Sequence, residues 1–281
     1  SKNDYKKILE GIMNNKIEVS VVIPVYNAEK TICECVDSVV DEIVTNGLSY
    51  EVILVDDGSK DNSLALCKQY SESNPCIKVI TQKNSGPSVA RNTGIKNACG
   101  EFIALNDADD KWLPGKMKIQ IEELRKNPEV DLVCAKYGSS RRVGKRTEIT
   151  YKKEIFHNFF SPQTSAFRLS ALVCGDVKFC ENQKYSEDMR FLLDFMQHGK
   201  CVYLPFLATV PVFSKCVFGE AGLSSHIWKM EVGELKNILF AKKIREINIF
   251  VMLIAMFWSL LKFFRRAAIS GFIKIRKIFR R

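Results

Sequence analysis

Short apolar runs alternate with helical patterns through the first part of the chain. Four runs of mostly apolar, often β-branched residues fit strands that are buried on both faces, at 19–25, 51–55, 77–81 and 101–105. Apolar residues three and four apart follow the first run from Ile32 to Ile43, and they predict a helix that Asn27 caps. Two more helices fit the segments that end near Tyr70 and that span about 87–98. The alternation predicts an α/β fold with one parallel, doubly wound sheet covered by helices on both faces.

After Pro114 the pattern is less regular. We expect a helix at 114–126, a strand at 131–135, a helix at 187–198 and a strand at 201–204. Residues 138–153 are polar and basic, which is typical of a loop.

Positive charge is concentrated at the C-terminal end. The formal net charge is +10, and residues 229–281 carry 13 Lys and Arg against three Glu, so the rest of the chain is balanced. A nucleic-acid enzyme would be expected to carry its basic surface on the working domain, so this distribution argues against nucleic acid as a partner. We therefore expect a domain over 1–228, with a nucleotide-binding half at about 18–110 and an acceptor half at about 111–228, and a helical tail over 229–281.

The tail contains an apolar run at 247–261, interrupted only by Asn248 and Ser259 and followed by basic residues. Spanning a bilayer takes about 20 apolar residues, so this run is too short. Its Phe, Ile and Trp side chains among Lys and Arg favour an amphipathic helix that lies on an anionic membrane surface. The alternative is a helix packed on the domain with solvated charges.

Ten cysteines are scattered along the chain without a Cys-x-x-Cys pair, which argues against a zinc ribbon. Several lie in apolar runs and predict buried free thiols in a reducing cytoplasm. The first residues lack the apolar core of a signal peptide, in agreement with a cytosolic chain.

Acidic residues follow two of the predicted strands. In doubly wound sheets ligands bind at the carboxyl ends of the strands. Five carboxylates at adjacent strand ends would repel one another unless a cation lay between them. An Asp-x-Asp turn can direct oxygens at Mg²⁺ or Mn²⁺, with water and phosphate completing the octahedron. The candidates are Asp56, Asp57, Asp107, Asp109 and Asp110.

Two common phosphate loops are absent from the sequence. No Gly-x-Gly-x-x-Gly follows the first strand, and no Gly-x₄-Gly-Lys-Ser/Thr occurs. Phosphate would therefore be held by a metal or by basic side chains, for which Arg91 and the loop residues Arg141, Arg142, Lys145 and Arg146 are candidates. For the loop residues, a solvated run of charges is an equal alternative. Asp56 and Asp57 could also accept hydrogen bonds from a base or ribose, and Tyr26 could lie against the base.

Four segments at these strand ends resemble the family 2 glycosyltransferases of the GT-A fold, in that family's order and spacing. They are Val21-Val-Ile-Pro-Val-Tyr-Asn27, Val55-Asp-Asp-Gly-Ser59, Gly86-Pro-Ser-Val-Ala-Arg-Asn-Thr-Gly94 and Asp107-Ala-Asp-Asp-Lys-Trp-Leu-Pro114. The resemblance extends through Ser186-Glu-Asp-Met-Arg-Phe-Leu-Leu193 and covers about 18–228. A further segment, 222–228, resembles the end of the catalytic domain in bacterial cell-surface polysaccharide transferases.

The resemblance implies an inverting, metal-dependent transfer from a nucleoside-diphosphate sugar, with UDP favoured, dTDP possible, and Mn²⁺ or Mg²⁺ as cofactor. Pro24, Tyr26, Asp56 and Asp57 would line the nucleoside pocket, with Arg91 near it or the donor. Asp107 and Asp109 would hold the metal and diphosphate, and Asp110 could reach the metal or the sugar. Asp188 would be the general base with Glu187 beside it.

Two features depart from the family pattern or extend it. The family often has Phe-Asp-Glu ahead of the base, and here the segment is Phe179-Cys180-Glu181. His226 stands where many members place a basic residue that faces the diphosphate, and a surface histidine is an equal alternative. Gln163 and Thr164 lie where acceptor contacts could form. The helix start is expected to lower the pKa of Asp188 and keep it ionised.

The resemblance and the tail together predict an enzyme of O-antigen or similar surface polysaccharide synthesis. It would act at the cytoplasmic face of the inner membrane as a peripheral protein, on a lipid-linked (polyprenyl-diphosphate) saccharide acceptor. One alternative is a non-catalytic, membrane-docked scaffold of the same fold, which would be expected to lack the acids at 107, 109 and 188. The other is a sugar nucleotidyltransferase, which generally carries a Gly-rich basic signature after the first strand.

Overall fold

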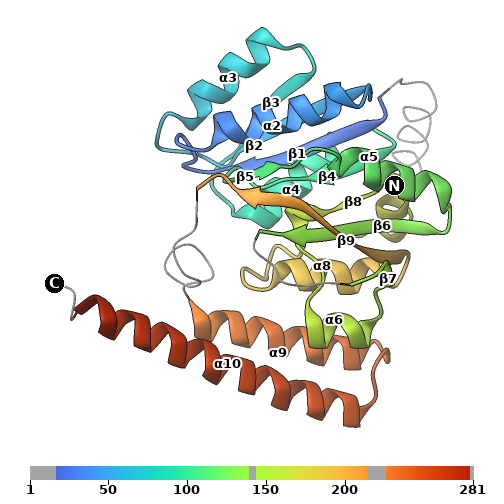
Figure 1. Ribbon diagram of the computed structural model, residues 1–281, viewed down its shortest axis with the longest axis vertical. Coiled ribbons are helices and arrows are strands. Elements are labelled where there is room, and N and C mark those ends of the chain that lie inside the picture. The colour runs from blue at the N-terminus through green and yellow to red at the C-terminus, as the bar shows by residue number, and fades with distance from the viewer. Residues whose placement is uncertain (1–16, 139–143, 214–225, 279–281) are drawn as a thin grey trace.

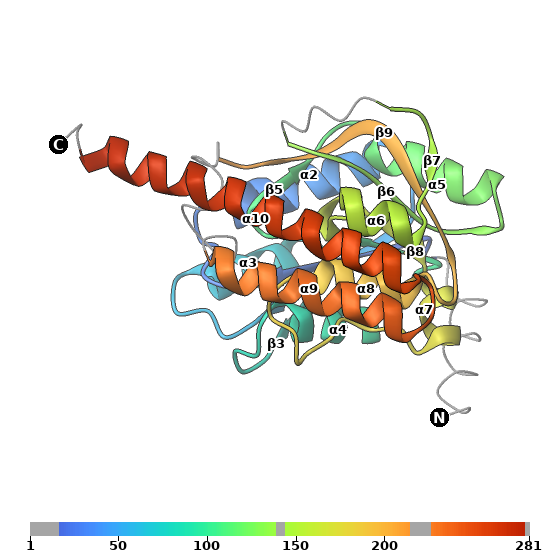
Figure 2. The same cartoon turned by 90° about the horizontal axis from the view of Figure 1, so that it is seen from below.

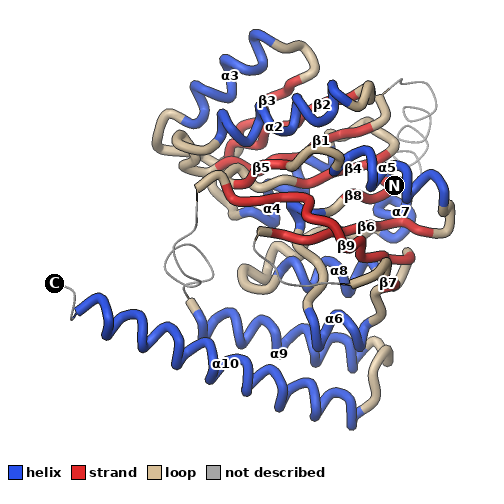
Figure 3. The backbone as a smooth tube through the Cα atoms, viewed as in Figure 1, coloured by secondary structure: helices blue, strands red, loops and turns tan. Residues whose placement is uncertain are grey.

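The structure is a computed structural model that describes residues 17–138, 144–213 and 226–278, with side chains described as far as Ile269. A nine-stranded sheet forms the central layer, with helices on both faces (Figure 1). The tube view separates the strands of this layer from the helices around it (Figure 3). Two long helices, α9 (Ile227–Lys243) and α10 (Ile249–Ile278), form an antiparallel hairpin beside this body (Figure 1).

The sheet is parallel in one half and mixed in the other. Its order is β3-β2-β1-β4-β8-β6-β9-β5, with β7 paired to β9. The four strands from β3 to β4 are parallel, β8 is antiparallel to β4 and β6, and β9 is parallel to β6. The strands are β1 (Val19–Val25), β2 (Tyr50–Asp56), β3 (Ile77–Thr81), β4 (Phe102–Leu105), β5 (Asp110–Trp112), β6 (Val130–Tyr137), β7 (Thr147–Glu148), β8 (Ala166–Arg168) and β9 (Lys200–Pro211). The predicted parallel sheet is thus confirmed for the first half of the domain.

The helices around the sheet are α2 (Ile32–Thr45), α3 (Ser63–Ser73), α4 (Pro87–Lys96), α5 (Lys116–Lys126), α6 (Tyr151–His157), α7 (Leu169–Gly175) and α8 (Glu187–Phe195), with a 3₁₀ turn η1 (Pro162–Thr164). Helices α2, α3, α4, α5 and α8 lie within a few residues of expected ones, whereas α6 and α7 were not predicted. The predicted loop at 138–153 was wrong in part, because it contains β7 and the start of α6.

Asn27 does not cap α2. The helix begins after Thr31, and Asn27 adopts a left-handed conformation with a φ of 49°. Its side-chain oxygen accepts a hydrogen bond from the backbone N–H of Lys60 at 2.8 Å. Asparagine tolerates this conformation better than most residues, so it links the loop after β1 to the loop after β2.

Alternate side chains of the central strands pack into separate cores on the two faces of the sheet. Val21 and Ile23 belong to the core beneath α2, whereas Val22 and Ile53 belong to the core on the α4 side. Helix α4 lies very close to β1, since a Cβ on Gly94 would come within 2.2 Å of a Val22 methyl. This close approach fixes Arg91, one turn earlier on α4, near the carboxyl ends of the strands.

A third apolar cluster joins the hairpin to the domain. Met189 and Leu193 of α8 pack with Ile238 of α9 and Ala255 of α10. Seen from below, α9 lies across α8 and α10 lies across α6 (Figure 2). Among the helices described, none combines the length and the apolar composition that crossing a membrane requires.

Lys116 is a fully buried lysine at the start of α5. Its ammonium lies 4.0 Å from the centre of the Trp112 ring and donates a hydrogen bond to the Gln120 side-chain oxygen at 2.8 Å. Burial lowers the pKa of Lys116 to about 7, and the nearby Glu42 carboxylate opposes this shift. The folded protein therefore loses this proton far below the usual range of a lysine.

Replacing Lys116 by Met should remove part of the pH dependence of stability. Unfolded Lys116 titrates near 10.4, so between about pH 7 and pH 10 only the unfolded state holds the proton, and stability rises with pH. From pH 7 to pH 9 the free energy of unfolding should rise by about 2 kcal/mol more in wild type than in Lys116→Met. Urea denaturation at both pH values measures this. The exposed Lys118→Met on the same helix should behave as wild type, and equal slopes in all three proteins would contradict the depressed pKa.

Candidate active site

The acidic run after β4 forms a turn closed by its own backbone and by Asn106. The Asn106 side-chain amide donates to the carbonyl of Asp110 at 3.0 Å, and the Asp110 N–H donates to the carbonyl of Asp107 at 3.0 Å. Asp109 is exposed and the Asp107 side chain is about a quarter exposed. The turn therefore leaves two carboxylates accessible at the carboxyl edge of the parallel strands.

Asp110 occupies a different environment from its neighbours. It is fully buried, and the Tyr137 hydroxyl donates to its Oδ1 at 2.6 Å. This bond joins the turn to the end of β6. In this arrangement Asp110 supports the turn, and its predicted contact with a metal or sugar is not favoured because no part of the side chain is exposed.

Arg91 connects two acidic segments that lie far apart in the sequence. Its guanidinium contacts Asp107 at 2.7 Å and Glu187 at 3.4 Å, and the residue is only 5% exposed. The guanidinium carbon also lies 5.2 Å from the centre of the Phe179 ring. The two carboxylates keep the pKa of Arg91 raised in spite of burial. One cation thus holds the acidic turn and the start of α8 in a single buried charge cluster.

Glu187 and Asp188 begin α8, as predicted. The backbone N–H of Met189 donates to Asp188 Oδ1 at 2.7 Å and orients this carboxylate. Burial, followed by the charge of Asp188, raises the pKa of Glu187 to about 7 although Arg91 opposes the shift. Burial also raises the pKa of Asp188, and the Met189 N–H and Arg91 offset only part of the rise.

The predicted pKa shift of Asp188 was therefore wrong in sign. The N-terminal end of a helix lowers the pKa of an exposed carboxylate. Here the side chain lies within the cluster, where the loss of hydration outweighs the helix and the guanidinium. A carboxylate with a raised pKa is a better proton acceptor than an ordinary aspartate.

Asp56 lies at the end of β2 with one oxygen satisfied and one open. Oδ2 accepts from the backbone N–H groups of Gly58 at 3.2 Å and Ser59 at 3.3 Å. Oδ1 is buried without a hydrogen-bond partner among the residues described. Buried acceptors are normally paired, so this oxygen fits a donor group of a ligand. Tyr26, half exposed, and Pro24 stand at the end of the neighbouring strand β1.

Asp57 holds the loop after β3. Its Oδ1 accepts from the Gln82 side-chain amide and the Ser85 N–H, both at 2.8 Å, and its Oδ2 accepts from the Gly86 N–H at 2.8 Å. Gly58 allows this loop to approach, since a Cβ there would lie 3.0 Å from the Asn84 nitrogen and its φ is 73°. Asp57 thus fixes the position of the loop after β3, beside the predicted nucleoside pocket.

The remaining predicted residues have mixed surroundings. His226 is exposed, precedes α9, and its ring lies edge-on to Tyr185 with 5.9 Å between centroids. Tyr185 is two residues before Glu187, so His226 lies near the start of α8. Gln163 and Thr164 are buried in η1, where the Thr164 hydroxyl donates to the Ser161 carbonyl at 2.8 Å. This burial does not favour an acceptor contact through Thr164.

The basic loop contributes no arginine to the cluster among the residues described. Arg141 and Arg142 lie outside the described residues. Arg146 forms an ion pair with Glu123 at 2.7 Å on the surface.

Tyr137 and Phe179 contact the site, but sequence reasoning did not identify them as site residues. Tyr137 follows Asp110 by 27 residues and carries no local motif. Phe179 was noted only as part of the departure from the family pattern. Phe179 is held beside Arg91 by Asn92, whose side chain bonds both its N–H and its carbonyl, and this link between residues distant in the chain is visible only in the structure.

Carboxylate oxygens are the ligands that Mg²⁺ and Mn²⁺ prefer. No group of three or more His, Cys, Asp or Glu side chains arranged to hold a metal occurs in the described part of the chain. Asp107 and Asp109 nevertheless fit a divalent ion that takes its other ligands from water and phosphate, since both are accessible on one turn.

Comparison with known proteins places these motifs in one family. The sequence model of glycosyl transferase family 2 matches residues 20–180, more than half of the chain. The chain is a family 2 glycosyltransferase. The match includes Arg91 and the acidic turn.

Relatives and solved structures agree with this assignment. The chain is 34% identical over 158 residues to the Escherichia coli enzyme UDP-Glc:alpha-D-GlcNAc-diphosphoundecaprenol beta-1,3-glucosyltransferase WfgD, covering 56% of each protein. It superposes on S. aureus TarS 1-349 in complex with UDP with a TM-score of 0.61 and 25% identity, over 79% of this chain and 66% of that one. Mannosyltransferase PcManGT from Pyrobaculum calidifontis, in complex with GDP-Man and Mn²⁺, matches 96% of this chain and 83% of its own with a TM-score of 0.66. At 16% identity this last likeness shows the fold alone, which is GT-A.

The curated relatives are generally longer than the aligned region. The matches cover between 13% and 56% of the relatives' own lengths. Their donors, acceptors and partners therefore bear on this chain only as proposals.

Proposed function

We propose that this glycosyltransferase moves a sugar from a nucleoside-diphosphate donor, with UDP favoured and dTDP the alternative, to an acceptor hydroxyl with inversion. The contact of one buried guanidinium with both Asp107 and Glu187 carries the proposal. Through this contact the acidic turn, whose carboxylates suit a metal and diphosphate, lies next to the start of α8, where Asp188 suits a general base. Inverting transfer requires both groups.

The donor nucleoside would bind at the ends of β1 and β2. The open, buried Oδ1 of Asp56 supports this assignment, because an N–H of a pyrimidine base would satisfy it. Tyr26 and Pro24 would flank the base, and Asp57 would keep the loop after β3 in place. Asp107 and Asp109 would hold Mn²⁺ or Mg²⁺, which when bound would neutralise charge on the leaving diphosphate.

Asp188 is assigned the acceptor proton. The acceptor oxygen forms a bond to the anomeric carbon while the bond from that carbon to the diphosphate oxygen breaks, and the hydroxyl proton passes to the Asp188 carboxylate. The Met189 N–H orients that carboxylate, and burial raises its pKa toward the range of an effective base. Glu187 and Arg91 would keep Asp188 in position beside the acidic turn, and His226 could face the diphosphate.

The acceptor is proposed to be a lipid-linked saccharide used in surface polysaccharide synthesis. WfgD acts, by its name, on a diphosphoundecaprenol-linked sugar. The basic, aromatic tail supports a peripheral location at the cytoplasmic face of the inner membrane, where such an acceptor is presented. Residues 1–228 would form the catalytic domain and 229–281 the part that associates with the membrane.

Nucleotide binding should depend on the divalent ion through the acidic turn. Calorimetry with UDP, dTDP and GDP is expected to show binding in Mn²⁺ that EDTA weakens at least tenfold, because a bridging cation is lost (about 1.4 kcal/mol or more). Asp109→Asn should lose most of the Mn²⁺ effect, whereas Asp41→Asn, an exposed acid on α2, should keep it. Equal affinities with and without Mn²⁺ in every protein would reject the metal role.

Transfer from a panel of UDP-, dTDP- and GDP-sugars tests the reaction itself. Nucleotide binding without any hydrolysis or transfer would favour the scaffold alternative. Release of pyrophosphate from a nucleoside triphosphate and a sugar phosphate would instead favour the nucleotidyltransferase.

A further inference from the structure

The second half of helix α10 directs polar side chains toward the protein, whereas its first half packs apolar side chains against the third apolar cluster. Four residues on the side facing α9 are Ala255, Ser259, Lys262 and Arg266. The Ser259 hydroxyl donates to Glu231 at 2.7 Å, Lys262 pairs with Glu234, and Arg266 contacts Glu234 at 3.0 Å and Glu231 at 3.5 Å. Amphipathic helices of water-soluble domains normally bury the apolar side.

The opposite side of α10 is apolar and exposed. Its large side chains include Phe250, Leu253, Ile254, Phe257, Leu261 and Phe264, and Phe257 is 64% exposed. Scattered exposed apolar residues are normal, but a contiguous set along one helix marks an interaction surface. Turning α10 to bury this side would remove Lys262 and Arg266 from the two glutamates. The ion pairs therefore fix which side faces outward.

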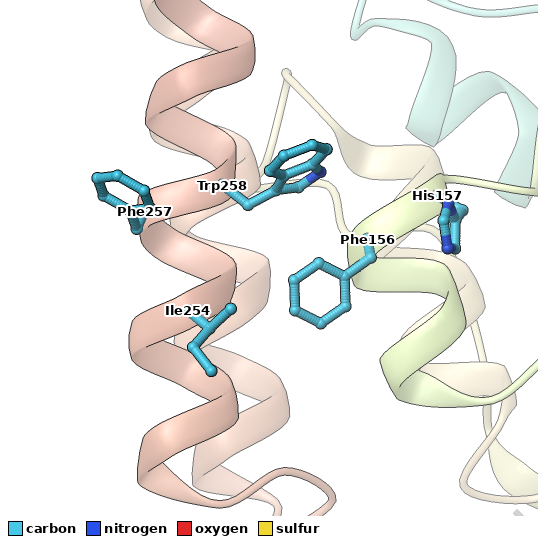
Figure 4. Close-up of a pocket in the computed structure, with 5 residues that line it drawn as sticks. All are labelled: Phe156, His157, Ile254, Phe257 and Trp258. Carbon is cyan, nitrogen blue, oxygen red and sulfur yellow. The ribbon is translucent and has the colours of Figure 1, made fainter.

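A groove between α6 and α10 extends this surface. It has a volume of about 280 Å³ and is lined by Phe156, His157, Ile254, Phe257 and Trp258. Phe156 of α6 is directed toward α10, and Trp258 of α10 is directed toward α6 (Figure 4). The groove is almost wholly apolar, which suits a hydrocarbon chain.

The exposed charges on the two helices that line the groove are basic, and Glu246 in the turn before α10 is an exposed acid near Tyr151 of α6. Helix α10 contains no acidic residue. On α6 and the part of α10 with described side chains, the exposed charged residues are Lys152, Lys153 and Arg265. Tryptophan and phenylalanine flanked by lysine and arginine are typical of helices that lie in the interface of an anionic bilayer.

We propose that the outward side of α10, with the groove between α6 and α10, is a docking surface for an anionic bilayer, and that the groove takes up an acyl chain of its lipids. The inference rests on the peripheral membrane location in the proposed function and identifies the surface responsible. It also gives a role to the polar α9–α10 contact, which holds the apolar side outward.

Sedimentation with vesicles of phosphatidylglycerol and phosphatidylcholine tests the surface. The double variant Leu253→Glu, Phe257→Glu should lower the binding constant at least tenfold, since two inserted side chains become charged (roughly the effect expected for interfacial helices). The matched control Val44→Glu, Ile119→Glu changes two exposed apolar residues on α2 and α5 and should bind as wild type. Removal of α10 is less suitable, because it would uncover Ile238 and Leu193 of the third apolar cluster.

Quenching of Trp258 tests the groove. In a Trp228→Phe background the other tryptophan, Trp112, is buried beside Lys116, so quenching reports Trp258. Phosphatidylcholine brominated on its acyl chains, mixed with phosphatidylglycerol, should quench this emission strongly. Unchanged emission, or equal vesicle binding by the double variant and wild type, would overturn the proposal. A double variant that loses self-association or a protein partner while still binding vesicles would also overturn it, in favour of a protein contact.

These measurements need no donor sugar. Failure of glycosyl transfer would count against the proposed function and leave vesicle binding as an independent result. If the protein did not bind vesicles, transfer to a water-soluble acceptor would still test the proposed reaction.

Discussion

Replacing Asp188 by Asn should lower the rate of glycosyl transfer by about 10²–10⁴-fold, the usual contribution of a positioned general base. The asparagine oxygen can still accept the hydrogen bond from the Met189 N–H, so the start of α8 is expected to keep its geometry. Nucleotide affinity should change little, because Asp188 is assigned to the acceptor and not to the donor. Initial rates with a labelled donor and calorimetry with UDP and Mn²⁺ separate the two effects.

Asp194→Asn is the matched control for this prediction. It makes the same change on the same helix, at a residue paired with Arg190 at 2.9 Å and outside the buried charge cluster. We expect near-normal transfer from this variant. If Asp188→Asn also turned over at a near-normal rate, the proton would have to go to another group, and Glu187 would be the next candidate because its pKa is about 7.

Replacing Arg91 by Met should destabilise the fold by about 3 kcal/mol and reduce transfer together with stability. Removing one member of a buried ion pair leaves the other charge without compensation, which typically costs about 3–5 kcal/mol. Here Asp107 is about a quarter exposed, so the lower part of that range applies. Chemical denaturation with urea measures the loss, and UDP binding in Mn²⁺ shows whether the acidic turn keeps its shape.

Two other variants show whether the burial of Arg91 causes this effect. Arg146→Met removes a surface ion pair with Glu123 and should cost less than about 1 kcal/mol. Arg91→Lys keeps the charge but lacks the planar group that contacts two carboxylates, so an intermediate loss is expected. An Arg91→Met protein as stable as Arg146→Met would show that the cluster contributes little to the fold.

Much of the parallel half of the fold could be predicted from sequence. The runs at 19–25 and 77–81 coincide with β1 and β3, because continuous β-branched residues favour strands buried on both faces. The residues after β2 and β4 indicated the edge of the sheet where Asp56 and Asp107 lie. The strands and this edge could be predicted because both depend on residues that are close together in the sequence.

The second half of the sheet could be predicted only in part, because the strands expected at 131–135 and 201–204 correspond to β6 and β9 but the short strands were missed. β5 has three residues and pairs with β9, which lies about a hundred positions later. β8 also has three residues and is antiparallel to β4. Strands this short have no periodicity of their own, so their existence depends on partners that only the folded chain supplies.

The state of the acidic residues was likewise decided by packing. Asp109 and Asp110 are adjacent in one motif, yet one is exposed and the other is fully buried against Tyr137. The sequence motif assigned both to the donor side. Packing also decided the pKa of Asp188. The sequence indicated a helix start that lowers this pKa, but desolvation by residues distant in the chain raises it by more.

The sequence by itself determined the family motifs, their order along the strands and the amphipathic character of the tail. These properties follow from residue types within short windows. Only the tertiary structure brought Arg91 between Asp107 and Glu187, and only it showed that the second half of α10 turns polar side chains inward to Glu231 and Glu234. Both arrangements join residues that are distant in the chain, and their energies depend on burial, which exists only after folding.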